Sequence, residues 1–221
     1  MSAAVPGRRE QNRIERTERI RAAAAELFAE DGYQASTTQR VAERAGIPVA
    51  TLFRYANTKG ELLLMVHNEA FAAAIAAGTR DAAAAASPLD RCLALLGAVV
   101  RSGLATPEIT SQYQRELMFG DPGERFRAEG LGLVAELAEQ LTRAISGGSP
   151  SPAAADAAAA LFAALHLQLV QGVQQDRSAA DMMTTLEAQA TLLLLGVTTD
   201  REQPATTSRG PHGNRNEENH G

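Results

Sequence analysis

The residues best suited to chemistry lie between Ser36 and Leu62, where hydrogen-bond donors alternate with small and apolar side chains. Arg54 carries a guanidinium group, which can donate two hydrogen bonds to the O6 and N7 atoms of guanine. Lys59 is the only lysine among 221 residues. It falls in the first turn of a predicted helix, where a cation is unfavourable unless an anion docks there. The stretch therefore predicts contacts with phosphate groups and base edges.

Two short helices and a tight turn are needed to hold these side chains. Thr37 can cap the first helix through its hydroxyl, and Gly46 can adopt the left-handed conformation that ends it. The second helix is expected over residues 48–55, starting at a proline, with Leu52 and Phe53 pointing inward. A helix, a glycine-containing turn and a second helix form the helix-turn-helix pattern.

Longer helices are expected on both sides of this motif. The apolar stripe before it predicts a helix over residues 13–31. The sequence from Thr58 to Glu61 is a capping box, which predicts a helix that continues to about Ala77. Gly78 is expected to end that helix, and an alanine-rich connector should follow over residues 78–87.

Residues 14–60 resemble the N-terminal DNA-binding domain of the TetR family of bacterial transcriptional regulators. The segments that carry the resemblance keep the family's order and spacing: Asp31-Gly32-Tyr33, Thr37-Thr38, Val41 to Ile47, Thr51 to Tyr55, and Thr58-Lys59 followed by Glu61-Leu62. The resemblance implies a ligand-responsive regulator, most simply a repressor. Such a protein binds a palindromic operator in double-stranded DNA as a homodimer.

The motif and the resemblance together select nine candidate DNA-binding residues: Thr38, Gln39, Val49, Ala50, Thr51, Phe53, Arg54, Tyr55 and Lys59. Arg54 is expected to distinguish guanine, while Thr51 and Ala50 pack against a thymine methyl group. Thr38, Gln39, Tyr55 and Lys59 are expected to hold phosphates without reading the sequence. Val49 and Phe53 depart from the family, which often has a polar residue and a tyrosine there.

The composition predicts an all-α fold, because alanine is abundant and only 4% of residues are aromatic. Four segments are expected: a flexible N-terminal arm (1–12), a helix-turn-helix DNA-binding domain (13–60), a helical ligand-binding and dimerisation domain (61–197) and a disordered tail (198–221). Later helices should start near Ser87, Thr106, Glu124, Ser151 and Ser178, where capping or turn residues precede apolar periods.

The net charge of −5 is unusual for a DNA-binding protein, and its distribution matters more than its total. Residues 1–62 carry ten basic against eight acidic side chains, whereas residues 63–221 carry eleven against eighteen. Within residues 36–60 four basic side chains face only Glu43. The motif is therefore expected to be the basic face, with an acidic remainder directed away from DNA.

A mostly apolar cavity for a small-molecule effector of unknown identity is expected in the larger domain. The candidate lining residues are the bulky and histidine side chains there: Met65, His67, Phe71, Tyr113, Met118, Phe119, Phe162 and His166. A plain hydrophobic core is the alternative reading of these residues. A different class of protein is also open, namely a helical small-molecule-binding or catalytic protein that uses His67 or His166. A DNA shift assay would separate the two classes.

Excess apolar surface on the last two helices, residues 153–175 and 178–195, predicts a homodimer held by a four-helix interface. The candidate interface residues are the apolar positions of these helices: Leu161, Leu165, Leu169, Val173, Met183, Leu186, Leu193 and Leu194. The alternative is that these side chains are buried within one subunit.

Several functional classes receive no support from the sequence. Cys92 is the single cysteine, which excludes an internal disulfide and fits a reducing, cytoplasmic location. The N-terminus lacks the apolar stretch of a signal peptide, and no apolar run approaches the 18 residues of a membrane span. No cluster of residues has metal-ligand spacing. We therefore expect no cofactor, no metal and no enzymatic activity.

Overall fold

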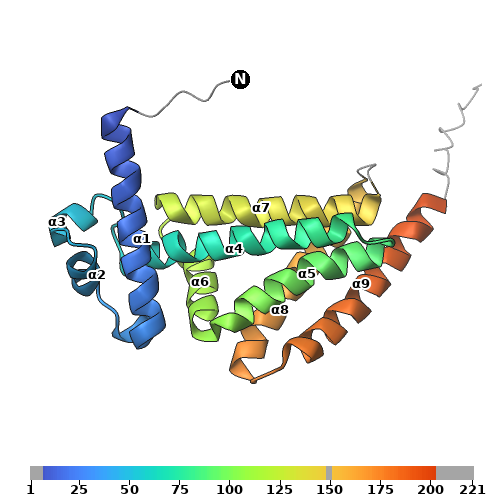
Figure 1. Cartoon of the computed structure of the whole chain (residues 1–221). Coiled ribbons are helices and arrows are strands. Elements are labelled where there is room, and N and C mark those ends of the chain that lie inside the picture. Colours follow the sequence, from blue (N-terminus) through green and yellow to red (C-terminus); the bar gives the residue numbers. More distant parts are fainter. Residues whose placement is uncertain (1–6, 148–150, 203–221) are drawn as a thin grey trace, which may run out of the picture.

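The computed structural model describes residues 7–147 and 151–202, and these contain nine α-helices and no strand. A small group of helices, α1 to α3, stands at one end of a larger helical body (Figure 1). The longest helix of the body, α4, runs from this group to the far end. The all-α prediction is therefore confirmed for the described residues.

The small group is built on α1 (Arg8–Ala35), whose inner face buries Ile20, Leu27 and Phe28. The helix breaks at Gly32, which has a φ of 78° that favours glycine. Beyond the break the Ser36 hydroxyl donates to the Gly32 carbonyl oxygen over 2.8 Å. The prediction of a flexible arm over residues 1–12 is wrong from Arg8 onward, because those residues already belong to α1. Residues 1–6 lie outside the described part.

Helix α4 (Lys59–Ala83) joins the two parts of the molecule. Its first turns place Leu62 and Met65 in the hydrophobic core shared with α1, and its later turns place Ile75 in the core of the body. Gly78 was predicted to end this helix, but the helix continues for five residues beyond it. A Cβ atom at Gly78 would lie 2.9 Å from the Leu95 Cα atom. Glycine therefore permits α5 to approach closely, which a sequence pattern does not distinguish from a helix stop.

The body continues with α5 (Pro88–Ala105), α6 (Pro107–Phe119) and α7 (Arg125–Ser146). The backbone N–H of Asp90 donates to the Ser87 hydroxyl over 3.0 Å, which confirms the predicted cap of α5. α6 is short and lies between α1 and the rest of the body (Figure 1). It contacts α1, α4, α7 and α8, so that it borders both parts of the molecule.

Helices α8 (Pro152–Gln174) and α9 (Ala179–Glu202) complete the body. Ser151 caps α8, because its hydroxyl accepts a hydrogen bond from the Ala154 N–H over 3.2 Å. The predicted disordered tail began at residue 198, yet α9 continues through Glu202. The part of that tail beyond residue 202 lies outside the described residues.

The last two helices correct the predicted dimer interface. Leu161, Leu165, Leu169 and Leu186 are buried within the chain itself. Met183, Leu193 and Leu194 are half-buried and pack against the same core, and the side chain of Val173 lies outside the described part. The reason is that α8 packs on α7 and α9, and α9 packs on α5, which uses the most apolar stripe of each helix. The large apolar side chains that these two helices leave exposed are instead Leu167, Leu192 and Leu195.

Two described helices, Lys59–Ala83 and Pro152–Gly172, are long and apolar enough to cross a membrane by length and composition alone. Unbroken apolar runs alone therefore do not identify these helices, because an 18-residue segment can keep a high mean hydropathy although it contains polar residues. In α4 those polar groups include Glu61 and Asn68, which are buried and hydrogen-bonded within the protein. The absence of a membrane partner stays a prediction.

Candidate functional sites

The helix-turn-helix is formed by α2 (Thr38–Arg44) and α3 (Val49–Leu52). The Thr37 hydroxyl accepts a hydrogen bond from the Arg40 N–H over 3.2 Å, as the capping pattern predicts. Gly46 has a φ of 64° and connects the two helices. The Ile47 N–H donates back to the Ala42 carbonyl oxygen over 3.0 Å, which closes the turn.

α3 is shorter than the predicted helix over residues 48–55. Pro48 is the N-cap and lies outside the helix, and residues 53–55 form turns. Leu52 is fully buried and anchors the helix to α1 and α2. Phe53 was expected to point inward as well, but 43% of its surface is exposed. The sharper turn after Leu52 rotates Phe53 to the outside.

The nine candidate DNA-binding residues lie on one continuous stretch, but their exposure differs. Gln39, Ala50, Phe53 and Arg54 are exposed, whereas Thr38, Val49, Thr51, Tyr55 and Lys59 are half-buried. Val49 and Tyr55 also pack against the core of the small group. The Gln39 amide donates to the Glu43 carboxylate over 3.1 Å. The side chains with most freedom to meet a partner are therefore those near Arg54.

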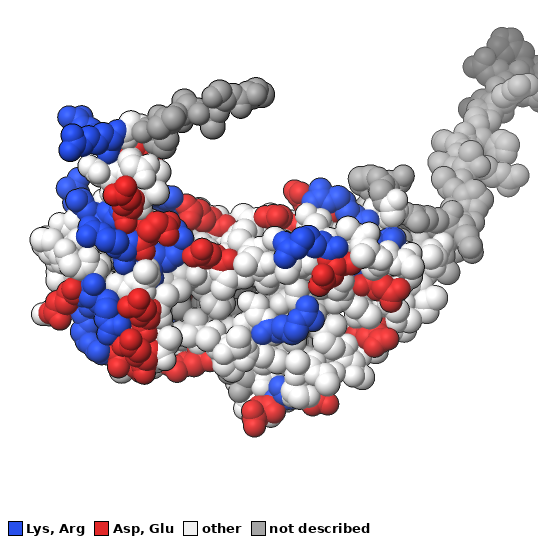
Figure 2. Space-filling view, in the orientation of Figure 1, with Lys and Arg blue, Asp and Glu red and all other residues white. Residues whose placement is uncertain are grey.

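The basic charge of the motif is partly neutralised by α1. Arg40 forms an ion pair with Asp31 over 2.7 Å. Arg44 pairs with both Glu26 and Glu30, and these carboxylates raise the pKa of its guanidinium group. Figure 2 accordingly shows basic and acidic side chains interleaved over this end of the molecule. The excess of positive charge predicted for residues 36–60 is therefore too large, because acidic side chains of α1 neutralise two of the four basic residues.

Arg54 differs from these two arginines, since it makes no ion pair with any residue that the structure describes. Its side chain is exposed beside Tyr55, at the end of the turns that follow α3. An unpaired guanidinium keeps all five N–H donors for a partner outside the chain. Arg54 is thus the strongest candidate in the motif for a directional contact.

Lys59 is held at the start of α4 by the small group of helices. Its ammonium group donates to the Gln34 carbonyl oxygen over 3.1 Å and lies 4.3 Å from the centre of the Tyr33 ring. Partial burial lowers the pKa of Lys59, while the nearby Glu108 carboxylate opposes that shift. An ammonium has three N–H donors, so two remain for an anion. Lys59 is therefore a cation that Gln34 and Tyr33 hold in position at the N-terminus of α4.

The capping box of α4 is also tied to the body. The Thr58 hydroxyl accepts from the Glu61 N–H over 2.9 Å and donates to the Glu124 carboxylate over 2.8 Å. The Glu61 carboxylate accepts from the Asn57 N–H over 2.7 Å. Burial raises the pKa of Glu124 despite the hydrogen bond from Thr58. The start of α4 therefore connects the helix-turn-helix to the loop before α7.

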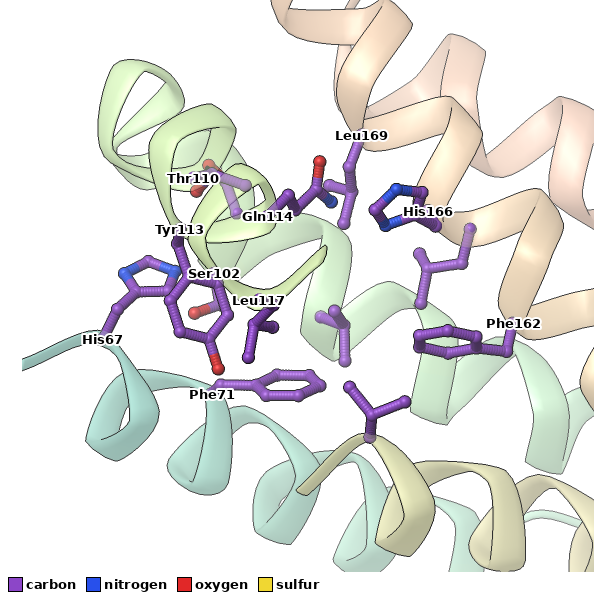
Figure 3. Close-up of a pocket in the computed structure, with 14 residues that line it drawn as sticks. His67, Phe71, Ser102, Thr110, Tyr113, Gln114, Leu117, Phe162, His166 and Leu169 are labelled. Carbon is purple, nitrogen blue, oxygen red and sulfur yellow. Dashed lines mark hydrogen bonds between the residues drawn. The ribbon is translucent and has the colours of Figure 1, made fainter. Parts of the chain in front are cut away.

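A cavity lies in the body between α4, α5, α6, α7 and α8 (Figure 3). Its fourteen lining residues are mostly apolar: His67, Phe71, Val99, Ser102, Gly103, Thr110, Tyr113, Gln114, Leu117, Val134, Phe162, Leu165, His166 and Leu169. The centre of a water molecule can occupy about 60 Å³ of this space. A single water needs roughly 10–15 Å³ by the same measure, so the cavity has room for a small molecule.

Five of the eight candidate ligand-binding residues line this cavity: His67, Phe71, Tyr113, Phe162 and His166. The other three lie elsewhere. Met65 is buried in the core shared with α1, while Met118 and Phe119 are 56% and 81% exposed. In the last turn of α6 Leu117 is buried against the cavity, whereas Met118 and Phe119 are exposed on the other side of the helix.

A hydrogen-bonded chain runs from the cavity wall to the start of α7. The Tyr113 hydroxyl donates to the Asn68 side-chain oxygen over 2.8 Å, and the Asn68 amide donates to the Phe126 carbonyl oxygen over 2.8 Å. The His67 ring packs on Tyr113 with centroids 4.4 Å apart. Burial lowers the pKa of His67 to about 4 and raises that of Tyr113. Both side chains are therefore uncharged at neutral pH.

Sequence reasoning missed three polar residues of the cavity, namely Ser102, Thr110 and Gln114. The Thr110 hydroxyl donates to the Gly103 carbonyl oxygen over 2.7 Å. Gln114 is buried, and its side-chain oxygen has no hydrogen-bond partner among the described residues. A signal was available, because residues 110, 113, 114 and 117 follow the helical spacing of one face of α6. A glutamine on an otherwise apolar face is the feature to notice.

The described part of the chain holds few other groups of side chains that could bind a metal or react with a ligand. No group of three or more histidine, cysteine, aspartate or glutamate side chains among the described residues could hold a metal ion. Cys92 is buried, which raises the pKa of its thiol to about 11. His166 lines the cavity from α8, and burial lowers its pKa. The helix-turn-helix and the cavity are therefore the two candidate sites.

Comparison with known proteins bears on both sites. Residues 20–66 match the family model for bacterial regulatory proteins of the tetR family. The HTH-type transcriptional repressor KstR of Mycolicibacterium smegmatis is 28% identical over 190 residues, covering 86% of this chain and 90% of that protein. KstR of Rhodococcus jostii is 29% identical over 180 residues, covering 81% of this chain and 83% of that protein.

Solved structures resemble the whole fold. A TetR transcriptional regulator from Rhodococcus sp. RHA1 matches with a TM-score of 0.69 and 20% identity, covering 84% of this chain and 99% of that one. The repressor FadR of Thermus thermophilus, solved with lauroyl-CoA, matches with a TM-score of 0.68 and 22% identity, covering 89% of this chain and all of that one. At these identities the likeness shows a shared fold.

Proposed function

We infer that this chain, which belongs to the TetR family of bacterial transcriptional regulators, is a DNA-binding repressor that responds to a small-molecule effector. The observation that carries the inference is the capped helix-turn-helix with an exposed, unpaired Arg54. Relatives that match over most of their length are named as repressors, which supports the direction of regulation. The protein acts in the cytoplasm, as a regulator and not as an enzyme.

DNA recognition follows from the exposure of α3 and the turns after it. The second helix of such a motif lies in the major groove, which brings Ala50 and Arg54 to base edges. Arg54 distinguishes guanine, because its two parallel donors match O6 and N7. Lys59 presents its two free donors to a phosphate at the start of α4, which fixes the register without reading bases. Gln39 and Thr38, at the start of α2, supply further contacts with the DNA phosphates.

Dimerisation uses the open side of α8 and α9. Leu167 of α8 and Leu192 and Leu195 of α9 are 50%, 69% and 59% exposed. Ala159, Ala160 and Ala163 of α8 are exposed as well. Exposed apolar patches of this kind mark protein–protein contacts. Two copies of the pair would form a four-helix interface with two-fold symmetry. Each dimer then presents two α3 helices to two half-sites of a palindrome, about 10 base pairs or a multiple apart.

The effector binds in the cavity, and α6 couples the cavity to the DNA-binding domain. One side of α6 contributes Thr110 and Gln114 to the cavity wall. Another side packs Ile109 into the core shared with α1, and Tyr113 and Leu117 contact both. A ligand that displaces α6 must therefore move the packing beneath α1. Packed interfaces of this kind switch between discrete arrangements and do not deform continuously.

A series of hydrogen bonds gives a second connection between the cavity and the DNA-binding domain, beside the apolar contacts of α6. Tyr113 holds Asn68, Asn68 holds the start of α7 at Phe126, and Glu124 of the same segment holds Thr58 at the start of α4. The effector favours an arrangement of the two DNA-binding domains whose spacing does not fit the operator. Because the effector and the operator favour different arrangements, effector binding lowers the affinity for DNA and releases the protein.

The alternative, a catalytic protein that uses His67 or His166, receives less support. Both histidines line the cavity, but none of the described lining residues is a carboxylate, a cysteine or a lysine. A histidine base is normally oriented by a hydrogen-bonded partner next to a nucleophile. Here His67 packs on Tyr113 with the ring planes tilted by 50°, and the Tyr113 hydroxyl donates its proton to Asn68. The binding of an effector explains the same cavity with fewer requirements.

Gel-shift titration of the DNA upstream of the protein's own gene tests the proposal. Wild-type protein should shift this DNA in the presence of excess unrelated DNA, and Arg54→Ala should lose about 1–3 kcal/mol of discrimination. Arg143→Ala is the matched control, because Arg143 is an exposed arginine in the last turn of α7, at the other end of the body. Binding without any preference for the upstream DNA would refute the proposed function.

A further inference from the structure

The chemistry of the cavity wall narrows the class of effector. Gln114 is 8% exposed, its side-chain oxygen is buried and unpaired among the described residues, and it lines the cavity. Building on the proposed function, we propose that the effector is an uncharged, mostly apolar molecule whose hydroxyl group donates a hydrogen bond to the Gln114 side-chain oxygen. Burying a carbonyl oxygen of this kind without a hydrogen bond costs free energy, and a ligand that donates a hydrogen bond to it removes that cost.

The donor has to come from the ligand, because Thr110 and Tyr113 donate their hydroxyl protons elsewhere and no described hydroxyl, including that of Ser102, donates to the Gln114 oxygen. Thr110 donates to the Gly103 carbonyl oxygen, and Tyr113 donates to Asn68. His166 has a single N–H when its ring is neutral, and it makes no hydrogen bond to a residue that the structure describes. Figure 3 shows the Gln114 amide and the His166 ring on the same side of the cavity. Rotation of the Gln114 amide brings its oxygen to the cavity surface, where a ligand hydroxyl can donate to it while the hydroxyl oxygen accepts from His166.

The cavity wall carries no charge to match a charged ligand. None of the fourteen lining residues is an arginine, lysine, aspartate or glutamate. Burial lowers the pKa values of His67 and His166, so both rings stay neutral near pH 7. A carboxylate bound here would lose its hydration without gaining a cation, which is strongly unfavourable. The wall therefore selects against fatty acids in their ionised form.

The rest of the cavity suits a hydrocarbon. Phe71 and Phe162 lie on the side away from the Gln114 amide in Figure 3. Val134, Leu165 and Leu169 complete this apolar wall. Apolar side chains of this kind bind carbon chains or rings through burial of apolar surface. Gln114 thus supplies the polar selectivity and the remaining wall supplies most of the affinity.

Four probes of equal chain length test the proposal: 1-octanol, methyl octyl ether, octanoate at pH 7.5 and octanoyl-CoA. Titration calorimetry on the full-length wild-type protein should show 1-octanol binding about tenfold more tightly than the ether, which accepts but does not donate. Octanoate should bind more weakly than 1-octanol. Octanoyl-CoA should also bind more weakly, although the structurally similar FadR of Thermus thermophilus was solved with lauroyl-CoA.

Two variants assign the effect to Gln114. Gln114→Met keeps a side chain of similar size, and it should reduce the tenfold preference for 1-octanol over the ether to none. Gln189→Met is the matched control, because the Gln189 side-chain oxygen is also buried and unpaired among the described residues but lies outside the cavity. It should leave the preference unchanged. The comparison of ligands on wild-type protein stands even if a variant folds poorly.

Several results would overturn the proposal. These are equal affinity for 1-octanol and its ether, tighter binding of octanoate or octanoyl-CoA, an unchanged preference in Gln114→Met, or no binding of any probe. Binding of the ligand-free protein to upstream DNA is measured separately. If DNA binding holds while the preference fails, only the effector class is wrong. If DNA binding fails, the proposed function is wrong whatever the probes do.

Discussion

Removing one oxygen atom from Tyr113 tests the hydrogen-bonded chain that links the cavity to α7. In Tyr113→Phe the ring keeps its contacts with His67 and Phe71. The lost hydroxyl leaves the Asn68 side-chain oxygen buried without the donor that now lies 2.8 Å away. An acceptor left unpaired in this way costs about 1–3 kcal/mol. The free energy of unfolding should therefore fall by that amount, with an unchanged denaturant slope.

Urea unfolding followed by circular dichroism measures the change, at one fixed protein concentration because a dimer's stability depends on it. Tyr33→Phe is the matched control. Tyr33 is also buried, but its hydroxyl makes no hydrogen bond within the described part of the chain. This substitution should therefore alter stability by less than about 0.5 kcal/mol.

A double substitution separates the hydrogen bond from other effects of the missing oxygen. In an Asn68→Leu background the acceptor is gone, so Tyr113→Phe should cost close to nothing there. Equal costs in the two backgrounds would refute the reasoning. So would a Tyr113→Phe protein as stable as the wild type.

Three further predictions concern the other parts of the account. Lys59→Ala should weaken binding to every DNA sequence by the same factor and lower the salt slope by roughly one unit per subunit, measured by titration at several salt concentrations. Leu192→Arg should give monomers in sedimentation, since a charge buried without a partner costs several kcal/mol. Leu131→Arg, at a 40% exposed position of α7, should leave the dimer intact. The pKa of His67 is about 4 when folded, below the ordinary value, so the unfolded chain binds more protons as pH falls. Unfolding free energy should drop by about 1.4 kcal/mol per pH unit from pH 6.5 toward pH 4, and His67→Phe should flatten this slope.

The helix-turn-helix was predictable because its determinants are local. The cap at Thr37, the left-handed Gly46 and the capping box at Thr58 each act within a few residues of the chain. The same holds for the serine caps of α5 and α8. Local rules of this kind can be read from the order of residues alone.

Features that depend on packing between distant segments were not predictable. Gly78 resembles a helix stop in the sequence, and only the close approach of α5 explains why the helix continues. The neutralisation of Arg44 depends on Glu26 and Glu30, which α1 brings alongside it. Periodicity places these groups on a face of their own helix but does not identify the neighbour.

The dimer and cavity predictions failed in part for a related reason. Leu161 and Leu169 were selected because they are apolar, yet the most apolar stripe of α8 serves the protein's own core. The remaining exposed positions, such as Leu192, are the ones free to meet a second copy. In the cavity, Gln114 was not predicted because the prediction rested on bulky side chains and not on buried polar ones.

The central claim is that two α3 helices of one dimer recognise two half-sites of DNA. Hydroxyl-radical footprinting of the DNA upstream of the protein's own gene tests this most directly. Two protected stretches related by two-fold symmetry are expected, with centres about 10 base pairs or a multiple apart. Protection that spreads evenly along the DNA at saturating protein, or a single protected stretch without a symmetric partner, would contradict it.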